Sequence, residues 1–410
     1  MENLLSVEEA RKRILAKFTE KPSITIQLDD GLNQILSEDI RTNIDLPPFD
    51  NSSMDGFAVI ASDLENLSED NPIELEVIED IAAGHYPKNE VHSGQASRIM
   101  TGAPLPSGAN AVVPVEFTNY SDRYAQQLLM DKIIVYQSVK VGDYVRPRGQ
   151  DIQKHEKILS KGHKLRPQDL GFLAAQGIDR VSVVKQPVVA LLSSGDELLK
   201  PGEELVPGKI YDSNSVTIKT LLTSFGAHII DLGVAKDNFN DIKSKLDSAL
   251  ESEIDLIIST AGVSVGVYDF IREVILEDGN LNFWKVNIRP GKPLTFGEYK
   301  KKPFLGLPGN PVSAYVSCLV FVKPIIQKLY GLQKEIHYYE TVITEDILSD
   351  GRESYLRAII HTENGKYQAK LASHQGSGNI FSLVCANALL IIPAGVKSVP
   401  KGKSVKFFWI

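Results

Sequence analysis

Between residues 186 and 332 the sequence alternates between short apolar strands and amphipathic helical segments. Helical segments are predicted at 213–226 and 239–252, and strands at 188–193, 228–234, 254–260, 283–288 and 304–307. In the second helix Phe239, Ile242, Leu246 and Leu250 fall on one face. Repeated strand–helix alternation predicts a parallel, doubly wound α/β sheet, which binds ligands at the carboxyl ends of its strands.

The rest of the chain has a different texture. Short β-rich segments alternate with Gly, Pro and Asn turns from about residue 46, and β patterns return after 333, including a hairpin expected to turn at Asn364-Gly365. We therefore predict a multidomain α+β protein in which the α/β domain is joined by an inserted β-rich domain and a C-terminal β-barrel-like domain. The predicted boundaries are 1–45 plus 141–185, 46–140, 186–332 and 333–410.

The bulk composition excludes several classes of protein. The net charge of −8 argues against a nucleic-acid-binding protein, which needs a basic face. No apolar run is expected to cross a membrane, and the charged N-terminal helix pattern at 5–18 is not a signal peptide. Cys318 and Cys385 lie in apolar surroundings and are interpreted as reduced core thiols, which favours a cytoplasmic protein.

Acidic residues follow two of the predicted strands of the α/β domain. Asp196 and Glu197 come after the first strand, and Asp237 comes shortly after the second. Each acid alone is equally typical of a solvated turn before a helix, where the helix dipole favours negative charge. Together, at the carboxyl ends of strands, they become candidate site residues.

A small-residue loop follows the third strand. Gly262 and Gly266 bracket Ser264, and such glycines let backbone N–H groups approach an anion closely. Asp269 follows the loop, and a carboxylate beside a phosphate is repelled unless a divalent cation lies between them. The pattern therefore predicts a phosphate site with Mg²⁺, for which Glu197 and Asp269 are the candidate ligands.

A second anion site is predicted where the chain becomes basic. Arg289 and Lys292 flank Pro290-Gly291, and the prolines of this loop hold the two cations in place. In the later sequence GLPGNPVS, Asn310 is expected to cap a helix with Pro311 in its first turn and Pro324 as a later kink. Ser313 would then lie in the first turn, where free N–H groups favour anions.

A series of motifs gives the chain a family resemblance from end to end. NSSMDGFAV, MTGAPLPSGANAVVPVE, RPRGQDI, SSGDEL, GVSVG with a following Asp, FWKVNIRPGKP, GLPGNPVS and HQGSGNIFS occur in this order. The combination resembles the molybdopterin molybdenumtransferases, the MoeA and gephyrin E-domain family. The resemblance implies Mg²⁺-dependent insertion of molybdate into adenylylated molybdopterin, with release of AMP and the molybdenum cofactor.

The resemblance also implies roles for particular residues. The acids handling nucleotide and Mg²⁺ would be Glu197, Asp237 and Asp269, beside a cradle of Gly262, Ser264 and Gly266. An interface cleft would contain Asp55, Thr101, Arg146 and Asp151. The pterin-phosphate and molybdate side would contain Lys285, Arg289, Lys292, Pro308, Pro311 and Ser313, with Arg357 and Ser377 reaching in from the C-terminal domain.

The resemblance further implies a homodimer with its site across the subunit interface, and possible contact with the molybdopterin adenylyltransferase. Two alternatives stay open: a nucleotide pyrophosphatase built on the same α/β domain, and a non-catalytic scaffold like gephyrin. The first would release AMP without molybdate, and the second would be expected to carry more chain than 410 residues. Molybdate and tungstate are too alike in size and charge to be distinguished at this level.

Overall fold

The computed structural model describes residues 4–65, 67, 71–120, 131–260, 270–332 and 336–410. Its chain divides into two compact units. The first contains residues 1–37, 164–166 and 181–410, and the second contains residues 38–163 and 167–180. The four domain boundaries expected from the sequence stay a prediction.

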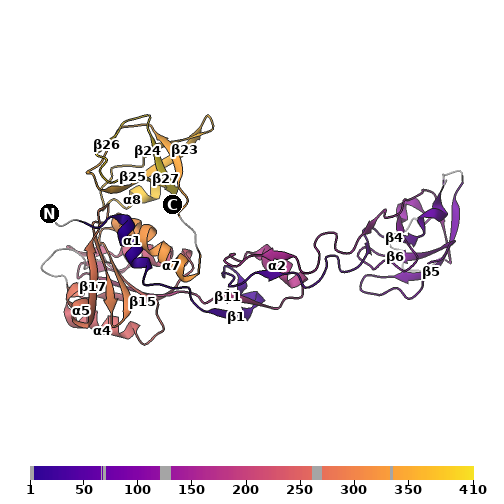
Figure 1. Ribbon diagram of the computed structural model, residues 1–410, viewed down its shortest axis with the longest axis horizontal. Coiled ribbons are helices and arrows are strands. Elements are labelled where there is room, and N and C mark those ends of the chain that lie inside the picture. Colours follow the sequence, from indigo (N-terminus) through magenta and orange to yellow (C-terminus); the bar gives the residue numbers. More distant parts are fainter. Residues whose placement is uncertain (1–3, 66, 68–70, 121–130, 261–269, 333–335) are drawn as a thin grey trace. The chain divides into compact units, whose positions relative to one another are not determined.

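The centre of the first unit is a six-stranded mixed sheet (Figure 1). Its strands, in spatial order, are β15 (His228–Ala235), β12 (Val188–Ser194), β16 (Leu256–Thr260), β20 (Lys302–Leu307), β19 (Pro293–Tyr299) and β17 (Gly279–Lys285). The first four are mutually parallel, as predicted. The sequence interpretation missed β19, which is antiparallel to both neighbours and turns into β20 at Lys300-Lys301, where both residues have positive φ.

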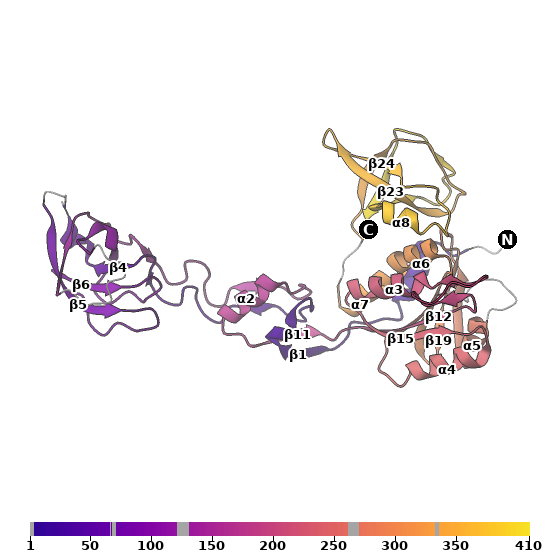
Figure 2. The same cartoon turned by 180° about the vertical axis from the view of Figure 1, so that it is seen from behind.

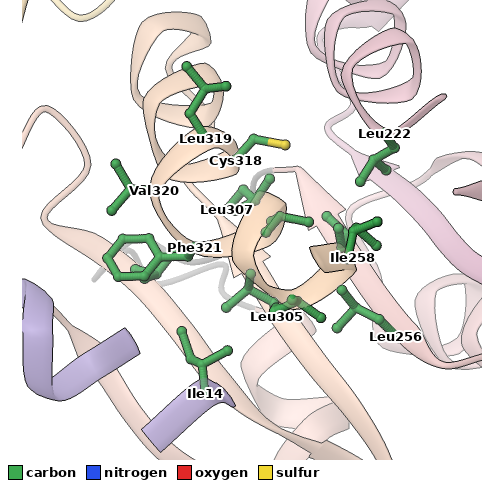
Figure 3. Close-up of a cluster of buried hydrophobic side chains, with 14 of the residues drawn as sticks. Ile14, Leu222, Leu256, Ile258, Leu305, Leu307, Cys318, Leu319, Val320 and Phe321 are labelled. Atoms are coloured by element: carbon green, nitrogen blue, oxygen red, sulfur yellow. The ribbon is translucent and has the colours of Figure 1, made fainter. Parts of the chain in front are cut away.

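Helices cover both faces of this sheet, so the doubly wound prediction is confirmed. On β12, Val189 and Leu191 belong to one hydrophobic core and Ala190 and Leu192 to the other, as the two-residue period of a strand requires. The first core packs against α1 (Val7–Leu15), α3 (Ser213–Ser224), α6 (Pro311–Ser317) and α7 (Lys323–Leu329), and Figure 3 shows part of it. The second packs against α4 (Phe239–Ala249) and α5 (Phe270–Asp278).

The chain from Pro311 to Leu329 is one continuous helical stretch with an irregular centre. A π-helical turn, η4 (Cys318–Val322), separates α6 from α7 directly before Pro324, where a proline that lacks an N–H disturbs the hydrogen-bond ladder. Contrary to the sequence expectation, this stretch is long and apolar enough by length and composition to span a membrane, but 72% of its apolar segment is buried in the protein. Cys318 is fully buried, which raises the pKa of its thiol, whereas Cys385 is only half-buried.

The N-terminal segment is fixed to the first unit by a strand pair and an ion pair. Strand β1 (Ser23–Gln27) leads into a short 3-10 turn, η1 (Leu28–Gly31), and pairs with β11 (Arg180–Val184). Lys21 Nζ lies 2.5 and 2.7 Å from the two carboxylate oxygens of Asp255, and both side chains are largely buried. Asp255 also accepts from Val188 N at 2.7 Å, so the pair holds the N-terminal segment where β12 begins.

The second unit is built around a five-stranded sheet, which confirms the β-rich inserted domain. Its order is β7 (Ala111–Pro114), β4 (Gly56–Val59), β6 (Gln95–Ile99), β5 (Ile73–Ile81) and β8 (Lys132–Val135). The remaining elements are the strand pair β3 (Asn51–Ser52) and β9 (Val145–Arg146), the pair β2 (Ile40–Arg41) and β10 (Lys157–Leu159), the short turns η2 (Ala61–Leu64) and η3 (Val115–Phe117), and the helix α2 (Pro167–Ala175).

The C-terminal sheet closes on itself, which confirms the barrel-like prediction. The closed ring contains β23 (Glu353–Glu363), β24 (Lys366–Leu371), β21 (Tyr339–Ile343), β27 (Ser404–Trp409) and β25 (Ala388–Ile392), which returns to β23. The predicted hairpin turn is confirmed, since Glu363 pairs with Lys366 and both Asn364 and Gly365 have positive φ. The short pair β22 (Ile347–Leu348) and β26 (Ser398–Val399) and the helix α8 (Phe381–Cys385) complete this part.

One further strand joins the two parts of the first unit. The sequence interpretation placed 283–288 in a single strand, but the chain leaves the α/β sheet after Lys285 and forms β18 (Ile288–Arg289). This strand pairs in parallel with β23 of the barrel at Glu353 and Ser354. The predicted basic loop therefore begins as a strand of the barrel sheet.

Candidate functional site

A cavity of about 420 Å³ lies at the carboxyl ends of the parallel strands. Ser194 and Thr260 are the last residues of β12 and β16, and Pro308 follows β20. Because these strands are parallel neighbours, their ends meet at one edge of the sheet. The wall is formed by Ser194, Glu197, Leu198, Ile210, Tyr211, Asp212, Ser213, Asn214, Thr260, Pro293, Pro308, Gly309, Asn310, Pro311 and Ser313.

Glu197 reaches the cavity through a sharp turn at Gly195. The φ of Gly195 is +149°, and a Cβ atom at this position would lie 2.6 Å from Glu197 Oε2. A larger residue would push the carboxylate away, so the glycine allows Glu197 to fold back over the loop. The chain then forms β13 (Leu198–Leu199), which pairs with β14 (Ile210–Tyr211), and both contribute to the wall.

The acids after β12 and β15 are linked through the backbone. Asp196 N donates to Asp237 Oδ2 at 3.2 Å, and Asp237 N donates to Asp196 Oδ1 at the same distance. Lys209 Nζ also donates to the backbone carbonyl of Asp196. The structure thus brings Asp196 and Asp237 together as the sequence indicated, although neither belongs to the cavity wall.

The start of α6 forms the opposite side of the cavity. Asn310 occupies the N-cap position, but its side chain makes no capping hydrogen bond, and Pro311 lies in the first turn. Asn214 Nδ2 donates to the Gly309 carbonyl at 2.7 Å, which fixes this loop against α3. Figure 2 shows α3 and α6 close together. Ser313 is 3% exposed and forms part of the wall, so the first turn of the helix faces the ligand space.

The basic loop lies directly against the same helix. Gly291 has a φ of +107°, and a Cβ atom there would lie 2.8 Å from Ser317 Oγ. Only glycine fits this close approach, which brings the backbone between Arg289 and Lys292 onto α6. Arg289 is half-buried and Lys292 is exposed.

Lys285 ends β17 beside an aromatic side chain. Its Nζ lies 3.6 Å from the centroid of the Trp284 ring, and the guanidinium carbon of Arg272 lies 4.9 Å from the same centroid. An aromatic face attracts cations, so Trp284 stabilises the position of the Lys285 ammonium. The sequence interpretation did not single out Trp284.

Arg357 has an environment that the sequence did not indicate. An arginine on a strand is ordinarily a solvated cation, yet the side chain of Arg357 is completely buried. The guanidinium donates to Ser382 Oγ at 2.9 Å and to the carbonyls of Gly376, His374 and Gln375 at 2.9, 3.3 and 3.4 Å. Burial, with a contribution from the positive charge of Arg289, lowers the pKa of Arg357 to about 10.

The contacts of Arg357 hold the segment that contains Ser377. The Ser377 carbonyl accepts from Val312 N at 3.1 Å, so this segment touches the first turn of α6. The structure therefore brings Ser377 to the predicted anion site. For Arg357 it favours a role in shaping that segment rather than direct contact with an oxyanion.

Four predicted residues lie in the second unit. Asp55 Oδ1 accepts from Thr101 N at 2.8 Å and from Thr101 Oγ1 at 2.7 Å. Arg146 pairs with Asn51 across β3 and β9, and Asp151 N donates to the Leu46 carbonyl at 2.9 Å. All four side chains are exposed. Asp55 and Thr101 thus form one cluster at the surface of this unit.

Four further predictions fall outside the described residues: Gly262, Ser264, Gly266 and Asp269 belong to the range 261–269. Within the described part of the chain, no three His, Cys, Asp or Glu side chains gather closely enough to hold a metal ion. Glu197 is the one predicted Mg²⁺ ligand whose position the structure describes.

The sequence interpretation missed Asp212, a buried acid of the cavity wall. It caps α3, since its Oδ1 accepts from Ser215 N at 2.9 Å, and it is 4% exposed. The signal was present in DSNS, where an Asp three residues before a Ser precedes a helical pattern. Capping alone accounts for an Asp at this position, so the pattern does not indicate a ligand.

The fold and its cavity define a class: a multidomain protein whose doubly wound domain has a cavity at the carboxyl ends of its strands. Comparisons with family models define it further. Residues 5–177 match the MoeA N-terminal region (domain I and II), residues 190–328 the probable molybdopterin binding domain, and residues 341–408 the MoeA C-terminal region (domain IV).

Known proteins give the same result. The chain is 35% identical to the molybdopterin molybdenumtransferase of a Nostoc species over 91% of this chain and 85% of that protein. It is 35% identical to the enzyme of the same name from Haemophilus influenzae, over 98% of each chain. A crystal structure of the MoeA protein from Pyrococcus horikosii superimposes with a TM-score of 0.82 at 31% identity, covering 99% of both chains. The chain therefore belongs to the MoeA family of molybdopterin molybdenumtransferases.

Proposed function

We propose that this chain, as a transferase of molybdenum cofactor biosynthesis, inserts molybdate into adenylylated molybdopterin with Mg²⁺ and releases AMP. One observation supports the proposal most. The cavity at the strand ends combines a carboxylate, Glu197, with the first turn of the helix that begins at Pro311. A substrate with a nucleotide and two phosphates requires both a cation-binding group and donors for anions. In this turn Pro311 has no N–H and Val312 N is bonded to the Ser377 carbonyl, so Ser313 is the proposed donor.

The acidic side of the cavity is proposed to handle the nucleotide. Mg²⁺ takes few protein ligands and keeps several waters, so Glu197 together with substrate phosphates suits it. Asp269, outside the described residues, is the second proposed ligand. Bound Mg²⁺ would neutralise phosphate charge. Asp237 and Asp196 each accept a hydrogen bond from the backbone N–H of the other. Asp237 is therefore proposed to hold in place the loop that contains Asp196 and Glu197.

The basic side is proposed to bind the pterin phosphate and molybdate. Lys285, Arg289 and Lys292 supply positive charge, and Ser313 and Ser377 lie at the start of α6. A tetrahedral oxyanion loses its hydration shell on binding, so fixed donors must replace those waters. Arg357 is proposed to act on this pocket by shaping the segment around Ser377.

The active form is proposed to be a cytoplasmic homodimer that receives its substrate from the molybdopterin adenylyltransferase. Asp55, Thr101, Arg146 and Asp151 of the second unit would then complete the site of another subunit. The chain has a mass of 45.2 kDa. Light scattering at micromolar concentration is expected to give twice this mass, and a stable monomer would contradict the assembly.

Anaerobic turnover of adenylylated molybdopterin, with and without molybdate, tests the reaction itself. AMP and the molybdenum cofactor should form together and only when molybdate is present. Glu197→Ala should abolish Mg²⁺-dependent AMP release without unfolding, because the exposed carboxylate adds little to the core. Glu251→Ala, on an exposed glutamate after α4, is the control. AMP release at the same rate with and without molybdate would instead indicate a pyrophosphatase.

A further inference from the structure

Three hydroxyl groups and one carboxylate form a continuous row behind the cavity. Thr260 Oγ1 lies 2.7 Å from Ser193 Oγ, and Ser193 Oγ lies 2.6 Å from Ser215 Oγ. Ser215 Oγ is hydrogen-bonded to Asp212 Oδ2, where the row ends. Ser193 and Thr260 are 1% exposed and are register partners on β12 and β16. This hydroxyl row therefore crosses two strands and the start of α3.

Counting protons fixes the direction of every bond in the row. A carboxylate only accepts, whereas a hydroxyl donates one hydrogen. Ser215 must donate to Asp212, so Ser193 must donate to Ser215. Because the hydrogen of Ser193 is then committed, Thr260 must donate to Ser193. The hydroxyl oxygen of Thr260 is left with lone pairs alone.

Thr260 belongs to the cavity wall, so this direction has a consequence for the ligand. We propose that Asp212, acting through the hydroxyl row, makes the Thr260 hydroxyl an obligate acceptor that binds a hydroxyl of the nucleotide sugar. A phosphate oxygen only accepts and cannot bond to Thr260 in this state. Asp212 is thus a positioning residue for a binding group.

The position of Thr260 fits a sugar hydroxyl. The helical stretch Pro311–Leu329 begins at the same cavity, where its first turn suits a phosphate. The pterin phosphate proposed to lie at this turn is bonded to the AMP phosphate, which carries the sugar, so the sugar hydroxyls are the donors of the nucleotide nearest to that group. This inference rests on the proposed function, because it assumes that the cavity binds the nucleotide of the substrate.

The substitution Asp212→Asn can change the direction of the hydrogen bonds in the hydroxyl row while keeping the shape of the side chain. Asparagine caps a helix about as well as aspartate, so α3 should keep its N-terminus. Its amide can donate to Ser215, which allows the row to reverse and frees the hydrogen of Thr260 for the cavity. Ser193→Ala is the second variant, because it cuts the row without touching the cap.

Ser6→Ala is the matched control for capping. Ser6 Oγ accepts from Glu9 N at 3.1 Å at the start of α1, and Ser6 does not belong to the cavity wall. This variant loses a helix cap as a damaged α3 would, but it leaves the hydroxyl row intact. Thermal unfolding of all variants shows whether any change in binding comes from lost stability.

The measurement is calorimetric binding of AMP, 2′-deoxy-AMP and 3′-deoxy-AMP. The wild-type protein and Ser6→Ala should bind at least one deoxy nucleotide about fivefold more weakly than AMP, the effect of one net hydrogen bond. A sugar hydroxyl can also accept, so the variants are compared with 2′-deoxy-2′-fluoro-AMP and 3′-deoxy-3′-fluoro-AMP, whose fluorine only accepts. The wild-type protein and Ser6→Ala should bind the fluoro nucleotide as weakly as the matching deoxy nucleotide. In Asp212→Asn and Ser193→Ala the ratio of fluoro to deoxy affinity should rise above one, because Thr260 can then donate.

Two results separate this inference from the proposed function. A wild-type protein that binds no AMP would contradict the proposed function and the inference with it. A wild-type protein that binds AMP and both deoxy nucleotides equally would overturn the inference alone. So would an unchanged ratio of fluoro to deoxy affinity in both folded variants, since the row would then have no influence on the ligand.

Discussion

The α/β domain and the C-terminal barrel each contain one arginine that the sequence assigned to an oxyanion pocket, and the two differ in burial and in their contacts. Arg289 is a half-buried residue at the edge of the basic loop. Arg357 is fully buried, and its guanidinium donates to three backbone carbonyls and one serine hydroxyl. An arginine in a family motif can therefore bind the ligand or stabilise the protein. Its hydrogen-bond partners show which of the two roles it has.

Replacing Arg357 should have the largest effect. Arg357→Ala leaves the carbonyls of the 374–376 segment and Ser382 Oγ without their donor, and each hydrogen bond to a charged group contributes about 1.5–3 kcal/mol. We expect a loss of stability on the order of 3 kcal/mol or more, measured by thermal unfolding, with molybdate and AMP binding weakened together.

Arg357→Lys tests geometry apart from charge. Lysine keeps the positive charge but lacks the planar fork that reaches several carbonyls at once, so it should restore only part of the lost stability. A stable Arg357→Ala protein with normal AMP affinity and a higher molybdate requirement would contradict the structural role. It would indicate that Arg357 contacts the oxyanion directly.

Arg289→Ala should give the opposite pattern. One unit-charge pair at 4 Å and an effective dielectric of 20 corresponds to about 4 kcal/mol before desolvation. We therefore expect the molybdate concentration for half-maximal cofactor formation to rise by roughly ten- to a thousandfold, with unfolding unchanged. Separate titrations with molybdate and with AMP check this. An equal loss of affinity for both would show that Arg289, like Arg357, has a structural role.

Trp284→Leu should have a smaller effect on the α/β side. The cation–π contact with Lys285 contributes about 0.5–1 kcal/mol where it is exposed, so the KM for the phosphorylated substrate should rise about two- to fivefold with kcat unchanged. Trp284→Phe keeps an aromatic face and should recover part of the loss.

Trp409→Leu is the matched control, because the chain has two tryptophans and Trp409 lies in the barrel. Trp409 packs edge-on against Phe407 and Tyr367, so its loss should lower the stability of the barrel and leave the KM unchanged. A raised KM in both variants would show that the effect of Trp284 is not specific to Lys285.

The smallest expected effect concerns Asp247 of the α/β domain. Burial would raise the pKa of this carboxyl, but hydrogen bonds from Lys300 and Tyr299 outweigh it and hold the pKa below its usual value. A lowered carboxyl pKa gives stability that is present above the unfolded value and lost as the pH falls through the folded value. Asp247→Asn should thus be slightly less stable at pH 7 and equal to wild type in strong acid. A difference that persists at pH 2 would exclude this linkage.

The sequence predicted those parts of the fold that follow from local periodicity. The four parallel strands of the doubly wound sheet, the Asn364-Gly365 turn and the helix at Pro311 follow from local residue patterns, and each is present. Strand β19 was missed because its pairing is set by β20 and β17, which no local pattern encodes. Likewise, Arg357 and Asp212 depend on contacts made after folding, and neither burial nor hydrogen-bond direction can be read from residue type.

The pairing of β18 with β23 means that the α/β domain and the barrel are not separable modules. Ile288 and Arg289 are register partners of Glu353 and Ser354, and Arg352 Nη1 donates to the Ile288 carbonyl at 3.0 Å. One family model ends at residue 328 and the next begins at residue 341. A chimera joined between these residues would exchange β23 without its partner strand β18. A workable exchange has to transfer the β18 segment together with the barrel, although more than 40 residues separate them in the chain.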